Sequence, residues 1–320
     1  MDEIVCANTA FRYWRCPPQV RDLYPRLPNS EDGWRALSQS PFVVDVLKTP
    51  IIAVASSGCC NHHSGLRTTI RWEGASEASA TIDTHLGFSV TNPLNTLFTM
   101  TRFVSQIDLV LAMYELCGWF SVFEPASAAE MQLKMAVEEN RNSSTQDLFE
   151  LGEGEDEIPW KRVYARTTVK VPVNEGQTNN REDGREVTKL KGTSLWMRKP
   201  LIELSDLHRF AEKVKSQMWG KQFYDAAQQV IGIAASPLEV AGVLLLSRSR
   251  RLGGSGFRYV YLNDLTPLSE EAQSIAGQKV CYGDIVIVNP ILMKAAIIEI
   301  QGEVIHGSGA VLDQDAERMC

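Results

Sequence analysis

The sequence predicts a fold of mixed helices and strands, α/β in class and α+β overall, divided into two parts. The chain has 320 residues, which is enough for about two domains of ordinary size. Of these residues 44% are hydrophobic and 22% are charged. That composition allows a substantial core and excludes collagen-like and wholly disordered chains. Helix-like and strand-like patterns also follow one another in both halves of the chain.

The front part, residues 1–145, predicts a mixed α/β domain. Its first ninety residues combine turn-rich stretches with short apolar runs such as Pro50–Ala55. A pair of helices follows. Asn92 and Pro93 form a typical start for the first helix, and Ser105 caps the second, which Gly118 ends. Residues 126–143 predict a third helix.

The middle of the chain, residues 146–195, predicts an acidic and polar linker that contains the domain boundary. It is poor in large apolar residues, and it begins with a strongly acidic stretch at 150–157. One segment within it differs, because Val169, Val171 and Val173 alternate with polar residues as in a strand.

The back part, residues 196–320, predicts helices followed by strands. The helical patterns cover Ser205–Lys215, Phe223–Ile233 and a segment that opens at Ser236. Three strand-like runs then follow, of which the last two are separated by an Asn-Pro turn: Tyr259–Leu262, Val280–Val288 and Ala295–Ile300.

Charge is distributed unevenly between the two halves. The net charge is −7, but residues 1–160 carry 11 basic and 21 acidic side chains, or −10, whereas residues 161–320 carry 21 and 18, or +3. Such an asymmetry indicates that the halves meet different partners. We expect a protein partner for the acidic front half and DNA for the back half.

The cysteines and the apolar stretches predict a cytoplasmic protein. Seven cysteines, with no Cys-x-x-Cys spacing, fit a reducing compartment better than a disulfide framework. The start of the chain lacks the pattern of a signal peptide. The most apolar stretches, Ile107–Cys117 and Asp284–Ile300, are interrupted by charged residues, so we expect no membrane partner.

Three acidic residues of the back part are the candidates for chemistry: Glu239, Asp284 and Glu299. Asp284 and Glu299 lie in strand-like runs rich in Ile and Val, where a carboxylate is costly unless a partner or a cation compensates it. Two carboxylates from adjacent strands can together bind a hard divalent ion such as Mg²⁺.

These residues resemble a nuclease core. Asp284, followed by Glu299-Ile-Gln301, resembles the Asp…Glu-x-Lys motif of PD-(D/E)XK nucleases. The continuation through Gly302, His306, Asp313 or Asp315 and Arg318 resembles the branch akin to very-short-patch-repair endonucleases, and Ser236-Pro-Leu-Glu239 is similar to the helix that precedes the core there. This resemblance covers residues 230–320. Separately, Phe88–Leu97 and Met113–Gly118 resemble actinobacterial proteins whose front half is similar to AbiEi-type antitoxins.

The resemblance implies a restriction-endonuclease-like mixed sheet with flanking helices and hydrolysis of DNA phosphodiester bonds. It implies Mg²⁺, or Mn²⁺, held by Asp284, Glu299 and the main-chain carbonyl of Ile300, with Glu239 able to join. Gln301 replaces the usual Lys, so it can orient a water molecule but supplies no positive charge. His306 is suited to proton transfer or phosphate contact. Because the chain ends shortly after Arg318, we also expect the domain to be truncated at its C-terminus.

Plainer interpretations stand beside these. Ser236-x-x-Glu239 is also a capping box, which accounts for Glu239 without any catalysis. Asp284 also fits an edge-strand or turn residue, and Glu299 with Gln301 fits a strand end that faces solvent. The function we expect is a metal-dependent DNA endonuclease, with phage defence or a mobile element as its setting. The alternative is a non-catalytic DNA-binding or antitoxin-like regulator built on a degenerate nuclease fold.

Two further clusters have two interpretations each. Arg248, Arg250 and Arg251 fit either a solvated helix end or, together with Arg318, a clamp for DNA phosphates. Cys59, Cys60, His62 and His63 are awkwardly spaced for one tetrahedral zinc ion, so incidental loop residues are the favoured interpretation. We expect His85 and His208 to be ordinary surface or core residues.

Overall fold

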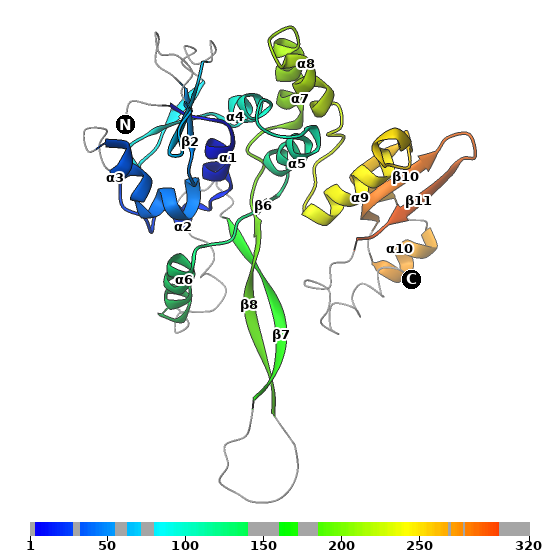
Figure 1. Cartoon of the computed structure of the whole chain (residues 1–320). Coiled ribbons are helices and arrows are strands. Elements are labelled where there is room, and N and C mark those ends of the chain that lie inside the picture. The colour runs from blue at the N-terminus through cyan, green and yellow to red at the C-terminus, as the bar shows by residue number, and fades with distance from the viewer. Residues whose placement is uncertain are drawn as a thin grey trace, which may run out of the picture.

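The computed structural model describes residues 4–27, 33–54, 63–71, 80–139, 160–171, 185–267, 270–277 and 279–300. Helices, one mixed sheet and two antiparallel sheets make up these segments, which confirms the predicted α/β class. Figure 1 shows the arrangement: a front body, a long hairpin projecting from it, and a small helix-backed sheet at the other side. In the described part of the chain, no helix is both long and apolar enough to cross a membrane.

The front body is built on a mixed five-stranded sheet. Its strand order is β3-β2-β1-β5-β4, with β1 parallel to β5 and antiparallel to β2. The strands are β1 (Ile4–Val5), β2 (Ile51–Val54), β3 (Arg67–Ile70), β4 (Thr81–Asp83) and β5 (Ser89–Thr91). The helices around it are α1 (Ala7–Arg15), α2 (Pro18–Arg21), α3 (Gly33–Gln39) and a π-helical turn at Val43–Leu47.

The two capped helices of the front part form as the sequence predicts. In α4 (Pro93–Met100) the side chain of Asn92 accepts a hydrogen bond from the main-chain N–H of Asn95 at 2.8 Å. In α5 (Gln106–Cys117) Ser105 accepts from the N–H of Asp108 at 3.2 Å, and Gly118 follows the last turn. The third predicted helix is α6 (Ser127–Glu139). Local capping signals therefore fix these starts.

A long hairpin occupies much of the segment expected to be a linker. β7 (Lys161–Val171) and β8 (Arg185–Met197) pair antiparallel, and β6 (Phe120–Val122) joins β8 near the body. The predicted strand around Val169 is thus confirmed. Residues 146–195, expected to be a linker, thus contain β7 and most of β8, which backbone pairing rather than apolar content defines.

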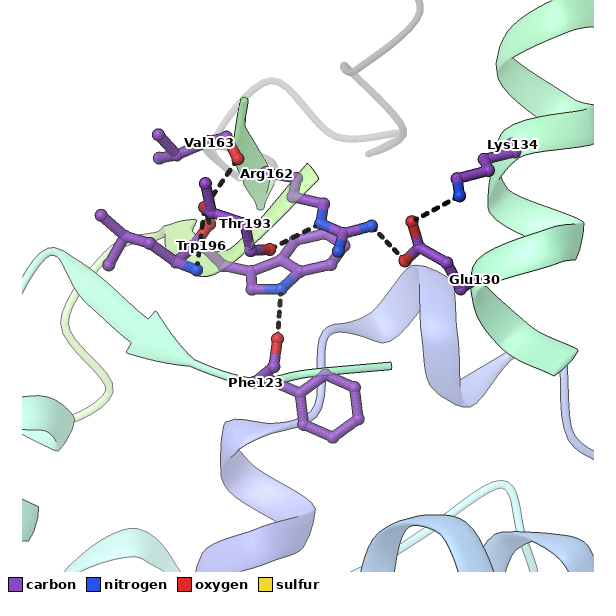
Figure 2. A network of polar contacts seen from close by, with 8 residues as sticks. Phe123, Glu130, Lys134, Arg162, Val163, Thr193 and Trp196 are labelled. Carbon is purple, nitrogen blue, oxygen red and sulfur yellow. Dashed lines mark hydrogen bonds and ion pairs between the residues drawn. The ribbon is translucent and has the colours of Figure 1, made fainter. Parts of the chain in front are cut away.

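Polar contacts fix the base of the hairpin to the body (Figure 2). The indole N–H of Trp196 donates to the carbonyl of Phe123 at 3.0 Å. The guanidinium of Arg162 donates to the carbonyl of Thr193 at 2.8 Å and to Glu130 of α6 at 2.5 Å. Its central carbon also lies 5.5 Å from the centre of the Trp196 ring. Strand, helix and ring are therefore joined by one arginine.

The back part begins with three helices and ends in a small sheet. The helices are α7 (Leu204–Val214), α8 (Gly220–Ala227) and α9 (Pro237–Ser247), and a short 3-10 turn follows at Arg250–Leu252. The remaining elements are β9 (Val260–Pro267), α10 (Glu270–Ala276), β10 (Val280–Asn289) and β11 (Lys294–Ile298). The sheet order is β11-β10-β9. Among the described strands of this sheet every pairing is antiparallel, whereas the resemblance implies a mixed sheet.

Helix α9 covers one face of this sheet at close range. Gly242 permits the approach, because a Cβ at this position would overlap the side chains of Ile285 and Ile300. Ile285 is fully buried. The sheet therefore has one face packed against α9 and a second face turned away from it.

The two predicted parts share a hydrophobic core. α5 of the front part contacts α8 and α9 of the back part. The hydroxyl of Tyr114 donates to the carbonyl of Gln229 at 2.9 Å and accepts from the N–H of Ile231 at 3.2 Å. Packing is thus continuous across the boundary that the sequence predicts, through buried residues that include Leu109, Met113, Phe223, Val230, Val240 and Val243.

Candidate carboxylate site on the back sheet

The pairing of β10 with β11 ends beside Asp284. The last paired residues are Ile285 with Ile298, and the chain continues past β11 through Glu299 and Ile300. The main-chain N–H of Ile300 reaches the Asp284 side chain. The structure therefore places Asp284 beside the segment Glu299–Ile300, which follows it by 15 positions in the sequence.

Glu299 lies between Ile298 and Ile300, which both pack against the core beneath α9. Because side chains of extended chain alternate, Glu299 points away from that core. Asp284 is half-buried and Glu299 is exposed. The Glu299 side chain is therefore in contact with solvent.

A hydrogen bond orients the Asp284 side chain. The main-chain N–H of Ile300 donates to Oδ2 of Asp284 at 2.7 Å. This bond holds the chain just past β11 against β10, and it places Ile300, whose carbonyl was predicted to be a ligand, beside the carboxylate. Asp284 and the segment Glu299–Ile300 therefore form one local unit.

The chemistry of this donor set fits a hard divalent cation. Two carboxylates and a main-chain carbonyl offer only oxygen atoms, and Mg²⁺ commonly binds one or two carboxylates while it keeps several water ligands. Within the described residues, no three His, Cys, Asp or Glu side chains form a group that could hold a metal ion. Among the described residues, the oxygen ligands offered are therefore two carboxylates and one main-chain carbonyl.

Glu239 is placed elsewhere, in the capping box of α9. Its Oε1 accepts from the hydroxyl of Ser236 at 3.0 Å, while Ser236 Oγ accepts from the Glu239 N–H at 3.2 Å. Its Oε2 accepts from the N–H of Ala235 at 2.9 Å. The carboxylate is almost fully buried on the α9 side of the sheet. The capping interpretation accounts for Glu239, and among the described residues it does not form a three-member metal-binding group with Asp284 and Glu299.

Asn263 is a structural residue that the sequence analysis missed. Its side-chain amide donates to Oε2 of Glu239 at 2.8 Å and to the carbonyl of Ile233 at 2.9 Å. Its φ of 50° is a left-handed conformation that Asn tolerates better than most residues. An Asn-Asp pair directly after a strand-like run was the available signal.

The arginine cluster lies in a hydrogen-bonded turn after α9. Arg248 donates from Nε to the side chain of Gln229 at 3.0 Å, and its carbonyl accepts from the N–H of Gly256 at 2.9 Å. Arg250 and Arg251 are exposed. Arg248 therefore stabilises the turn, whereas the side chains of Arg250 and Arg251 are accessible for contact with phosphate.

The remaining predicted residues divide into two sets. His208 contacts the carbonyls of Ala227 and Val230 at 3.2 and 3.1 Å, as expected of a structural histidine. His85 lies on the surface, 3.4 Å from Asp22. The following predicted residues lie outside the described part of the chain: Gln301, Gly302, His306, Asp313, Asp315, Arg318, Cys59, Cys60 and His62.

A second charged group, buried in the front body, was also missed. Glu115 accepts from Nε and Nη2 of Arg15 at 2.8 and 2.7 Å and from the N–H of Val122 at 2.9 Å. Arg198 donates to the Glu115 carbonyl at 2.6 Å. Burial lowers the pKa of Arg198 to about 10, although Glu115 and Cys117 oppose this shift. With Glu115 and Arg198 shielded from solvent, the group is structural.

Comparison of the chain with protein-family models, with curated proteins and with solved structures finds no match. The geometry of the site therefore carries the functional argument by itself.

Proposed function

We propose that this protein is a metal-dependent DNA endonuclease that hydrolyses phosphodiester bonds. The observation that supports the proposal is the closeness of Asp284 to the segment Glu299–Ile300, where the N–H of Ile300 donates to the Asp284 carboxylate. Two carboxylates supply the oxygen ligands that Mg²⁺ commonly uses, and a divalent cation bound there gives them a role in phosphodiester chemistry.

Asp284, Glu299 and the carbonyl of Ile300 would hold the ion. Bound Mg²⁺ or Mn²⁺ supplies a Lewis acid that activates water and stabilises negative charge on a phosphate. The Ile300 N–H keeps the Asp284 carboxylate in place, which reduces the reorganisation needed for binding. From the resemblance, we also expect Gln301 to orient a water molecule and His306 to serve in proton transfer.

Arg250 and Arg251 are the residues we assign to phosphate contact. They are exposed, and arginine binds phosphate oxygens through a planar pair of donors. Such contacts position the DNA backbone without reading its sequence.

The buried free thiols of Cys6, Cys16 and Cys117 agree with a reducing compartment, so we place the protein in the cytoplasm. We keep a protein partner as the expectation for the acidic front half.

Nicking of supercoiled plasmid in Mg²⁺ or Mn²⁺ tests the proposal. Glu299→Gln and Asp284→Asn remove one charge each while they retain shape, and Glu270→Gln on α10 is a matched control because this carboxylate is exposed elsewhere in the same part. We expect nicking by the wild type and by the control, and loss of nicking in both site variants and in EDTA. Equal nicking by all four proteins would contradict the assignment.

The alternative is a DNA-binding regulator without catalysis. The arginine turn favours it, because Arg250 and Arg251 can contact phosphate whether or not the carboxylates bind metal. A salt-sensitive gel shift in EDTA, without nicking in any metal, is the result that favours this alternative. An Arg250→Ala, Arg251→Ala double variant should then lose the shift, whereas Glu299→Gln should keep it.

A further inference from the structure

Three exposed aromatic side chains follow the arginine turn. Phe257, Tyr259 and Tyr261 have 47%, 46% and 43% of their surface exposed. Large rings so close together on a surface are unusual unless they meet a ligand or partner. We call these three residues, with Arg250, Arg251 and Arg258, the arginine–aromatic surface.

Register and alternation place the two tyrosines on the sheet face that α9 does not cover. Tyr261 pairs with Val286, and the carbonyl of Tyr259 accepts from the N–H of Val288 at 2.9 Å. Their neighbours Val260 and Leu262 are buried under α9, so alternation turns both tyrosines to the open face. Asp284 lies two residues from Val286 along β10. It is therefore a diagonal neighbour of Tyr261, at about 7–8 Å between main-chain positions.

The charged members of the arginine–aromatic surface are all arginines, and the exposed Asp264 follows it along the chain. Residues 240–263 contain four arginines and no acidic residue. Arg250, Arg251 and Arg258 are exposed, and none of the three forms an ion pair with another described residue. Unpaired arginines on a surface favour a polyanion.

The turn that carries the arginines is held in one shape. The N–H groups of Ser255 and Phe257 donate to the carbonyls of Leu245 and Leu246 at 2.7 and 3.0 Å. The Gly256 N–H bonds back to Arg248 as described above. These bonds fasten both sides of the turn to the end of α9, so the arginines and the first ring are presented without a large ordering cost.

We infer that the arginine–aromatic surface binds single-stranded DNA and leads it to Asp284 and Glu299. Arg250, Arg251 and Arg258 contact the phosphates, and unpaired bases stack on Tyr259 and Tyr261. A positively charged track with interleaved aromatic rings is the arrangement that single strands require, because the base faces of a duplex are already stacked. The choice of DNA rests on the proposed function, and the inference adds that the preferred substrate is unpaired.

Binding without metal tests this inference separately from cleavage. The probe is a fluorescent 20-nucleotide DNA, single-stranded or annealed to its complement, titrated with the full chain in EDTA and followed by anisotropy. We expect tighter binding of the single strand. Tyr261→Ala should weaken that binding about tenfold, in keeping with the loss of one stacked base, and Tyr261→Phe should keep it.

Arginine variants provide the second arm. Arg251→Ala should weaken binding of both probes and lower the dependence of affinity on salt. Arg35→Ala, an exposed arginine on α3, is the matched control and should change neither. Circular dichroism of each variant confirms that the fold is retained.

Two results would overturn the inference: equal affinity for both probes, or single-strand binding that Tyr259→Ala and Tyr261→Ala leave unchanged. Single-strand binding that depends on the rings, with no nicking in any metal, would instead refute the endonuclease and leave the inference standing. Binding of anionic lipid vesicles by the same arginines, without DNA binding, would assign the surface to a membrane and also overturn it.

Discussion

The main-chain N–H of Ile300 donates to Oδ2 of Asp284 at 2.7 Å, so one carboxylate serves both the fold and the candidate metal site. This double role is testable. Asp284→Asn retains an acceptor oxygen for Ile300, whereas Asp284→Ala removes it. We expect the Asn variant to unfold at nearly the wild-type urea concentration and the Ala variant to lose about 1 kcal/mol. Both should lose Mn²⁺ binding by titration calorimetry, and Mn²⁺ binding retained by either variant would count against Asp284 as a ligand.

Glu239 should matter for stability and not for metal binding. Its carboxylate accepts from Ala235, Ser236 and Asn263, and the amide of a glutamine can accept at only one of its two ends. We expect Glu239→Gln to lower the free energy of unfolding by about 1–3 kcal/mol, measured by urea denaturation, with the Mn²⁺ affinity unchanged. Ser236→Ala should cost about 1 kcal/mol by loss of the cap. A loss of Mn²⁺ binding in Glu239→Gln would instead show that Glu239 contributes to the metal site.

The Arg15–Glu115 ion pair should contribute far more to the free energy of unfolding than an ion pair on the surface does. Glu115 is buried, so Arg15→Ala leaves a buried carboxylate with its hydrogen bonds from Ser121 and Val122 alone. About a third of the Arg15 side chain is exposed, and we therefore expect a loss of about 2–3 kcal/mol in urea denaturation rather than the full cost of a broken buried pair.

The control for this pair is Arg209, which forms an exposed ion pair with Asp206 at 2.9 Å. Arg209→Ala should change the free energy of unfolding by less than about 1 kcal/mol. Equal losses for the two variants would show that Glu115 finds another partner once Arg15 is removed.

Tyr114 should make the protein less stable at alkaline pH. Burial raises the pKa of its hydroxyl from 10.0 to about 12, so the folded state retains a proton that the unfolded chain releases above about pH 10. The stability that this group contributes is complete below that pH and is lost as the pH rises toward 12. Between pH 9 and pH 11 the loss is about 1 kcal/mol.

Tyr114→Phe tests this by urea denaturation at both pH values. The variant should be less stable at pH 9, because the carbonyl of Gln229 and the N–H of Ile231 lose their partner, yet its stability should fall less between the two pH values. The lowered pKa of Arg198 acts with the opposite sign, but it is common to both proteins and cancels in the comparison. Parallel pH profiles would exclude Tyr114 as the titrating group.

Gly192 should be intolerant of a side chain as long as Arg162 is present. A Cβ at Gly192 would lie 2.5 Å from Cζ and 2.7 Å from Nη1 of Arg162, and the guanidinium is held by Thr193 and Glu130. We expect Gly192→Ala to cost about 1–3 kcal/mol. In an Arg162→Ala background the same change should cost almost nothing, and additive losses in this double-mutant cycle would refute the predicted clash.

Local signals account for what the sequence could predict of the fold. The caps at Asn92, Ser105 and Ser236 lie within three residues of the groups they bind, so the starts of α4, α5 and α9 are readable directly. β10 follows the predicted run Val280–Val288 with one residue added, because the apolar block Ile285–Val288 marks its second half.

The features that sequence analysis missed depend on distant partners. Glu115 and Arg15 are 100 residues apart, and no local pattern relates them. β8 carries polar residues along much of its length and is defined by pairing with β7, as in Thr167 with Lys189. For the candidate site, the closeness of Asp284 to the segment Glu299–Ile300 was predictable from two adjacent strands, but the bond of Glu239 to Asn263 joins elements that no local pattern relates.

The β7–β8 hairpin is a lever arm that is supported at its base only. From Tyr164 to Val171 the described part of β7 pairs with β8 alone, a reach of about 26 Å at the usual rise of a strand, and Figure 1 shows this length extending away from the body. A load applied near its far end reaches the body through the base, where Arg162 joins Glu130 and Trp196. A small displacement of the hairpin's outer part would therefore exert a torque on α6 and β6, transmitted through the contacts of Arg162.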